Sequence, residues 1–287
     1  MKKLVVIFSF LIISITAISQ KVSGKLKFEK GQTIEVSMQV KNMTAQQDMG
    51  QAIDFDAEGS AIQSCKVTSA TNENTSLHQQ PQKISFTFDG MGKKHSFDSD
   101  NQKDLDGQFG KPMKELLGKT YNIVLDPTGK ILKVQPEKTT TPKLDGPMMQ
   151  IGSMLKDLMD IMLPPKKDAA SFFKVLPKNE VSKGESWADS SENVNGKFNT
   201  SYTLTDITDS TIVIDFTGNS VTKRKAEMMG NESTTVMNNK TTGKIILDKL
   251  TGIIREKTST IESNGSTVVM RNTVPVTSKT TILIKVK

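Results

Sequence analysis

Alternation between apolar and polar residues recurs along most of this sequence, and it limits the chain to a small set of folds. A strand points successive side chains to opposite faces of a sheet, so a period of two is typical of strands with one buried and one solvated face. The clearest apolar positions are Ile34, Val36, Met38 and Val40; Ile84, Phe86 and Phe88; Tyr121, Ile123 and Leu125; Ile212, Ile214 and Phe216; and Ile282, Ile284 and Val286. The sequence therefore predicts a mainly β fold, a β-rich α+β protein with long antiparallel strands.

Glycine-containing pairs between these stretches are expected to form turns. They are Asp89-Gly90, Asn195-Gly196 and Asn264-Gly265. The two Asn-Gly pairs are good hairpin candidates, because both residues tolerate the positive φ that tight turns need.

Two pairs of similar segments occur in the same order, which favours an internal duplication. Residues 28–34 resemble residues 181–187, and residues 125–131 resemble residues 247–253. The alternative is that Lys-Gly turns and Asp-initiated turns recur by chance in a β protein. Duplication predicts two related sheet halves, 20–140 and 177–287, joined by a helical connector at 141–176. Within them, residues of about 25–135 and 177–287 are expected to superpose.

The connector contains the clearest helical pattern of the chain. Prolines at 142 and 147 precede it, and Pro164-Pro165 ends it. Its apolar residues follow helical spacing from Met148 to Met162, and they make this the segment richest in methionine. A second short helix is expected over 111–117.

Methionine-rich surfaces adapt to varied apolar shapes, so this helix is our candidate for contact with a ligand. The predicted ligand-binding residues are Met154, Leu155, Leu158, Met159 and Met162. The alternative is that this stripe is ordinary core, because an exposed apolar stripe would form a large sticky patch.

The first nineteen residues have the pattern of a secretory signal peptide. Lys2 and Lys3 precede an apolar run of about 12 residues, and Ala17 and Ser19 supply the small residues of a cleavage site before Gln20. A transmembrane anchor would need about 20 apolar residues. We therefore expect an exported protein, periplasmic or extracellular, without a transmembrane anchor. The single cysteine, Cys65, is expected to be a buried thiol.

Several function classes lack their usual residues. The net charge is +7, but the lysines are scattered and aromatic residues make up only 5%, which argues against nucleic-acid binding. With His78, His95 and one cysteine, neither a metal site nor a catalytic constellation is expected, and no cofactor is implied. Carboxylates at alternate positions of the loop 98–106 could hold calcium, but their spacing departs from that of an EF-hand loop, and an acidic surface loop is the favoured interpretation.

Particular segments resemble an uncharacterised family of secreted proteins of Gram-negative bacteria. They are the Ile18-Ser19-Gln20 end of the signal, Phe97-Asp98-Ser99, Gly129-Lys130-Ile131, and Pro177 followed by Val181, Gly184 and Trp187. These motifs are structural turns, so the resemblance implies no activity. Long strands with a covering helix are also similar, at the level of fold, to the half-barrel lipoprotein carriers of the periplasm.

Two function classes follow from these observations. The first is a non-enzymatic exported protein that binds a lipid or another apolar or amphipathic ligand in a concave sheet covered by a helix. The alternative is a structural or protein-interaction module of the cell envelope with no small ligand. Mass spectrometry of native protein would separate them, because a co-purifying lipid supports the first and a co-purifying protein the second.

Overall fold

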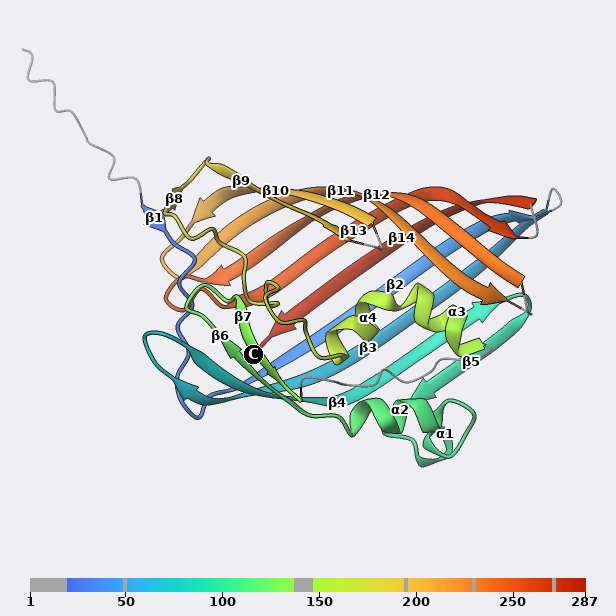
Figure 1. Cartoon of the computed structure of the whole chain (residues 1–287), viewed down its shortest axis with the longest axis horizontal. Coiled ribbons are helices and arrows are strands. Elements are labelled where there is room, and N and C mark those ends of the chain that lie inside the picture. Colours follow the sequence, from blue (N-terminus) through green and yellow to red (C-terminus); the bar gives the residue numbers. More distant parts are fainter. Residues whose placement is uncertain (1–19, 49–50, 137–146, 194–195, 229–230, 270–271) are drawn as a thin grey trace, which may run out of the picture.

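The computed structural model of the chain describes residues 20–48, 51–136, 147–193, 196–228, 231–269 and 272–287 (Figure 1). These residues form long strands and four short helices. The strands are β1 (Lys21–Val22), β2 (Thr33–Asp48), β3 (Gln51–Ala70), β4 (Thr75–Gly90), β5 (Lys93–Asp98), β6 (Tyr121–Leu125), β7 (Ile131–Gln135), β8 (Val181–Ser182), β9 (Ser186–Asn193), β10 (Gly196–Ile207), β11 (Thr211–Met228), β12 (Asn231–Asp248), β13 (Ile254–Val269) and β14 (Asn272–Val286). The helices are α1 (Gln102–Leu105), α2 (Gly110–Leu117), α3 (Pro147–Met154) and α4 (Lys156–Met162). The predicted mainly β fold is confirmed.

One large antiparallel sheet dominates the molecule. Its strand order is β7-β6-β4-β3-β2-β14-β13-β12-β11-β10-β9, with β5 paired to β4 beside this path. The strands before and after the helices meet where β2 pairs with β14, so the blue and red strands lie side by side in Figure 1. The sheet curls around α3 and α4. We call the face that carries these helices the inner face, and the opposite face the outer face.

The apolar residues form two clusters on the inner face. The larger cluster joins the inner residues of β2, β3 and β4 to α2, α3 and α4. The smaller cluster joins the first part of β11 and the last part of β12 to the segment that contains Val175 and Leu176. The alternation seen in the sequence therefore has its expected cause, which is burial of one face of each strand.

The expected helix over Met148–Met162 is divided into two. α3 ends at Met154, and α4 begins at Lys156. Leu155 between them has φ −100° and ψ 28°, outside the helical range, and its side chain is fully buried. Helical hydrogen bonds continue across Leu155, from its N–H to the carbonyl of Ile151 and from the N–H of Met159 to its own carbonyl, so the division is a local change of backbone angle. The second helix, expected at 111–117, is found as α2.

Two of the three predicted turns are misplaced. β4 continues through Gly90, and the positive φ values of this hairpin belong to Met91 (53°) and Gly92 (71°). Asn264-Gly265 lies inside β13 and pairs with β12. A Cβ atom on Gly265 would lie 1.9 Å from the carbonyl oxygen of Val236, so this glycine permits close strand approach. The third pair includes Asn195, outside the described residues.

The first pair of similar segments forms the same turn. The N–H groups of Gly31 and Gly184 donate to the carbonyls of Val67 and Leu204 at 2.8 and 2.7 Å. Both glycines have a φ of +89°. The next residue in each copy, Gln32 or Glu185, accepts a hydrogen bond from its partner residue in return.

The second pair of similar segments also matches locally. Oδ1 of Asp126 accepts the N–H of Thr128 at 2.8 Å, and Oδ1 of Asp248 accepts the N–H of Leu250 at 3.0 Å. Each aspartate therefore caps its turn at the residue two positions on. The duplication itself, with the boundaries 20–140, 141–176 and 177–287, stays a prediction. The signal sequence 1–19 and residues 141–146 of the connector lie outside the described residues.

Candidate functional site

A row of three aromatic side chains crosses the inner face at the β9 edge. Trp187 of β9 pairs with Tyr202 of β10, and Tyr202 pairs with Phe216 of β11. Directly paired residues share a face, so the three rings form neighbouring contacts. The Trp187 and Tyr202 rings stack at 5.4 Å between centroids with an interplanar angle of 12°, and Tyr202 and Phe216 lie 6.0 Å apart. We call these three residues the aromatic row.

A glycine on the next strand gives the row its room. Phe216 pairs with Gly243 of β12, and a Cβ atom there would lie 2.4 Å from Cζ of Phe216. Gly243 thus lets the Phe216 ring lean over the backbone toward β13. The ammonium of Lys257, on β13, lies 5.2 Å from the centroid of that ring. A cation over an aromatic face is attracted by the negative charge of the ring face.

The aromatic row is only partly closed by the protein. Phe216 is buried, whereas Trp187 and Tyr202 are half-buried and pack at the edge of the smaller apolar cluster. Nε1–H of Trp187 is itself buried and finds no acceptor among the described residues. Burial, followed by the nearby charge of Asp189, raises the pKa of Tyr202, so the phenol is neutral and can donate a hydrogen bond.

The helices present two different faces. Leu155 and Leu158 pack on Gly59 of β3, where a Cβ atom would lie 2.7 Å from Cδ2 of Leu158. On the polar side, the hydroxyl of Ser153 accepts a hydrogen bond of 3.2 Å from the guanidinium of Arg224 on β11. The two helices α3 and α4 therefore pack their apolar side on β3, and α3 also forms a hydrogen bond to β11.

The predicted ligand-binding residues lie together but are mostly enclosed. Leu155, Leu158 and Met162 are fully buried, Met159 keeps 8% of its surface, and Met154 is partly buried. They belong to the larger apolar cluster. Their contact with a ligand stays a prediction, and the structure adds that Met154 and Met159 keep the most accessible surface.

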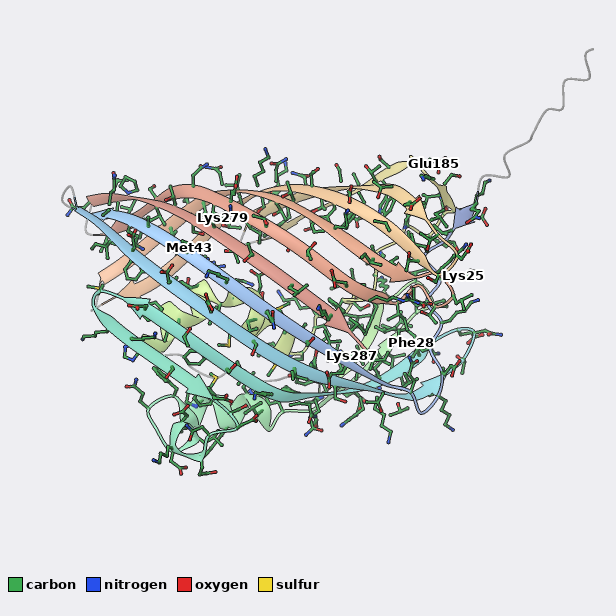
Figure 2. The ribbon with its side chains drawn as sticks, turned by 180° about the vertical axis from the view of Figure 1, so that it is seen from behind. Lys25, Phe28, Met43, Glu185, Lys279 and Lys287 are labelled. Carbon is green, nitrogen blue, oxygen red and sulfur yellow. The ribbon has the colours of Figure 1, made fainter. Side chains whose placement is uncertain are left out.

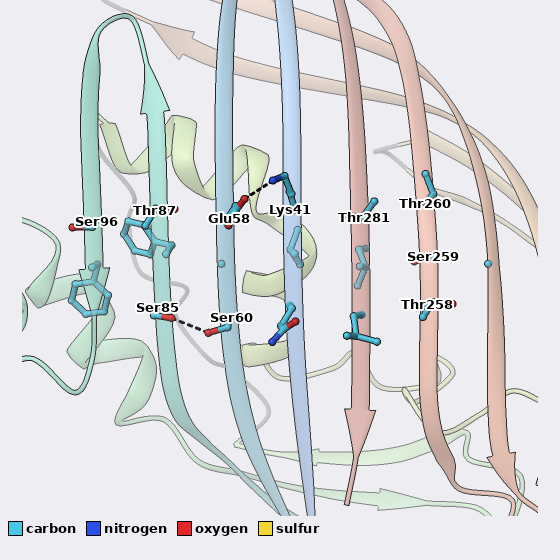
Figure 3. Close-up of a pocket in the computed structure, with 18 of the residues that line it drawn as sticks. Lys41, Glu58, Ser60, Ser85, Thr87, Ser96, Thr258, Ser259, Thr260 and Thr281 are labelled. Carbon is cyan, nitrogen blue, oxygen red and sulfur yellow. Dashed lines mark hydrogen bonds and ion pairs between the residues drawn. The ribbon is translucent and has the colours of Figure 1, made fainter.

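A groove lies on the outer face, opposite the helices (Figure 3). It has a volume of about 1220 Å³ and is lined by hydroxyl and charged side chains of β2 to β5 and β11 to β14. Its charges are largely matched, since Lys41 pairs with Glu58 at 2.7 Å and Lys244 approaches Asp215 at 3.9 Å. Such a lining offers few features that would select one ligand.

The acidic loop uses its carboxylates within the protein. Lys83 pairs with Asp98 and Asp100, Lys114 pairs with Asp106 at 2.8 Å, and Asp104 accepts the backbone N–H of Asp98. Within the described ranges, no three His, Cys, Asp or Glu side chains are grouped as a metal site would require. In the same part of the chain, no helix is long and apolar enough to cross a membrane.

The sequence pattern placed Phe216 on a strand, but it did not predict that Trp187, Tyr202 and Phe216 would lie together. Their meeting depends on the register of three strands, because a shift of one residue would turn a ring to the other face. Lys257 was missed. Its only sequence signal is a lysine at a position where alternation places an inward side chain.

Residues 72–254 match the description "Family of unknown function (DUF6263)". This range covers more than half of the chain and includes the helices and the aromatic row. The chain belongs to this family. The expected resemblance to an uncharacterised family is thereby confirmed. No curated protein sequence matches the chain.

Solved structures resemble the fold only distantly. Lipovitellin, described for its lipid–protein interactions, has a TM-score of 0.48 and 11% identity, and the alignment covers 91% of this chain and 26% of lipovitellin. This chain thus spans about a quarter of that protein. An outer membrane channel from Pseudomonas putida F1 has a TM-score of 0.25 and 9% identity, with coverage of 92% and 98%.

Proposed function

We propose that this protein binds a small apolar or amphipathic molecule on the inner face of its sheet, with the apolar part of the ligand against the aromatic row. The observation that supports this proposal is the partly open stack of Trp187, Tyr202 and Phe216 beside a polar inner surface. Ligand sites in proteins usually combine apolar and aromatic walls with a few polar groups that fix orientation.

The unpaired indole N–H favours a binding role over a purely structural one. A buried donor without a partner costs about 1–3 kcal/mol, so native cores seldom leave one. An acceptor atom carried by a ligand would remove this cost. The surroundings are suited to such a ligand, because Trp187 and Tyr202 offer ring faces together with N–H and O–H groups.

Beyond the aromatic row, the inner face of β11 and β12 is lined by small and polar residues. Along β11 and β12 its inward positions are Gly218, Ser220 and Thr222, and Thr241 and Asn239. A ligand with an apolar part and a polar part fits this boundary better than a fully apolar chain does. The Met-rich helices border the same face, so we include Met154 and Met159 as proposed further contacts.

Trp187 makes the proposal directly testable, because it is the only tryptophan of the chain. We expect the neutral fluorescent probe phenylnaphthylamine to bind saturably and to quench Trp187 emission by energy transfer. Replacing Tyr202 by Ala removes the central ring and should weaken binding about tenfold, equivalent to about 1.4 kcal/mol.

Phe28→Ala is the matched control, because Phe28 packs on Phe173 away from the aromatic row. It should leave the affinity unchanged. Absence of saturable binding to folded wild-type protein would overturn the proposal and favour the alternative of an envelope module without a small ligand.

A further inference from the structure

A lysine with no contacting carboxylate lies at the end of the aromatic row. The ammonium of Lys257 lies 5.2 Å from the centroid of the Phe216 ring, and no carboxylate lies within ion-pair distance of it among the described residues. Desolvation, the larger effect, lowers the pKa of Lys257, and Asp157 opposes it. Removing a charge from water without a partner is unfavourable, so such a residue calls for an explanation.

The two faces of the sheet differ in their charged residues. At paired positions of the described parts of β10 to β14, the inner face carries Lys257 and Arg224 and no carboxylate. The outer face of the same strands carries both signs. Its charged residues include Asp215, Lys240, Lys244, Glu256 and Glu262. On β9 the inner face also carries Asp189, which pairs with Thr200 and acts on Tyr202. The excess of positive charge is therefore confined to the inner face of β10 to β14, where Lys257 lies.

The carboxylates of the helices neutralise this positive charge only in part. Asp157 of α4 raises the pKa of Lys257, of Arg224 and of Lys156, while burial lowers all three. One carboxylate thus serves three cations. Lys156 also pairs with Asp160 on its own helix, which leaves Arg224 and Lys257 as the cations without a contacting carboxylate of their own.

Arg224 lies far along β11 from the aromatic row. Arg224 lies eight residues beyond Phe216 on β11, about 26 Å along the strand at about 3.3 Å per residue. Arg224 already donates to Ser153, whereas Lys257 adjoins the aromatic row. An acidic group on a ligand bound to the row would therefore meet Lys257.

We propose that Lys257 binds an acidic group of the ligand, so that the ligand class is an anionic amphiphile whose apolar part lies on Trp187, Tyr202 and Phe216. This inference rests on the proposed function, because it names the charge of the molecule that occupies the same site. A carboxylate and a phosphate share the required chemistry, which is an oxyanion beside an aromatic or aliphatic body.

The experiment compares two probes with the same ring system. Anilinonaphthalene sulfonate carries an acidic group, and phenylnaphthylamine does not. Wild-type protein should bind the sulfonate about tenfold more tightly, the effect of one charge-assisted contact. Lys257→Met should abolish this preference, because it weakens binding of the sulfonate about tenfold more than binding of phenylnaphthylamine. Competition by dodecanoate and by dodecyl phosphate then distinguishes the two kinds of acidic group.

Two variants control for net charge. Arg224→Gln removes a positive charge from the same face at a distance, and Lys279→Met removes one from the outer face, where Lys279 is labelled in Figure 2. Both should keep the preference for the sulfonate. Equal wild-type affinity for the two probes, or an equal loss in all three variants, would overturn the role of Lys257 while the proposed function stands. Failure of both probes to bind would instead overturn the proposed function.

Discussion

At the scale of single residues, the inner face combines closely packed apolar side chains with one desolvated charge. Gly59 and Gly243 lack side chains where Leu158 and Phe216 need the space, so each glycine serves a neighbour. Lys257 is the exception to apolar packing, because its charge is desolvated. Sites that bind ligands often retain such unfavourable groups, at a cost in stability that the bound ligand offsets.

Lys257→Met should stabilise the free protein by about 1 kcal/mol near neutral pH, because it removes a desolvated charge. The pKa of Lys257 lies below its ordinary value of 10.5 in the folded protein. The unfolded chain therefore binds more protons between the two values, and stability rises with pH there. The advantage of the variant should shrink as pH approaches 10.5.

Chemical denaturation of both proteins across this pH range measures the difference. Asp157 is the carboxylate that opposes the lowering of the Lys257 pKa. A variant that is less stable than wild type at neutral pH would contradict the account.

At the scale of elements, the apolar residues that predicted a helix from the sequence are the ones by which α4 joins the core. Its apolar stripe packs on β2 and β3, and its first residues carry the charges near the inner face. The helix is too short to be stable alone, since isolated helices need about 12–15 residues. Its conformation therefore depends on the sheet.

Leu158→Ala should lower the free energy of unfolding by about 3 kcal/mol, because it opens a cavity under a fully buried side chain. Leu250→Ala makes the same chemical change at a side chain that is 74% exposed, and should alter stability by less than about 0.5 kcal/mol. Urea titrations of the two variants give both values. Similar losses in the two proteins would show that α4 is not held by this packing.

At the scale of the whole molecule, the seam between β2 and β14 decides whether the chain behaves as one unit. The pairing runs from Val36 with Val286 to Gln46 with Val276. Ile282 and Ile284 of β14 belong to the same apolar cluster as β2, β3 and the helices. A continuous sheet and a shared core favour cooperative unfolding.

Two natural probes test this cooperativity. Trp187 lies on β9, and the only cysteine, Cys65, lies buried on β3. Burial also raises the pKa of Cys65 to about 11, so its thiol is protonated as well as shielded in the folded state. Trp187 fluorescence and Cys65 labelling should give the same denaturation midpoint. Labelling of Cys65 at lower denaturant than the fluorescence change would show separate unfolding of the two parts.

The alternating pattern by itself determined much of this protein. It predicted the mainly β fold and long strands such as β2, because burial of one face imposes a period of two. Other local signals, such as helical spacing and turn residues, identified the short helix α2, the apolar stripe of α3 and α4, and the Asp126 and Asp248 turns, all of which depend on neighbouring residues. Only the tertiary structure decided that Asn264-Gly265 stays within a strand, that Leu155 divides the helix, and that β2 pairs with β14. It also decided that Trp187, Tyr202, Phe216 and Lys257 meet, because strand register and packing between distant segments leave no local signal in the sequence.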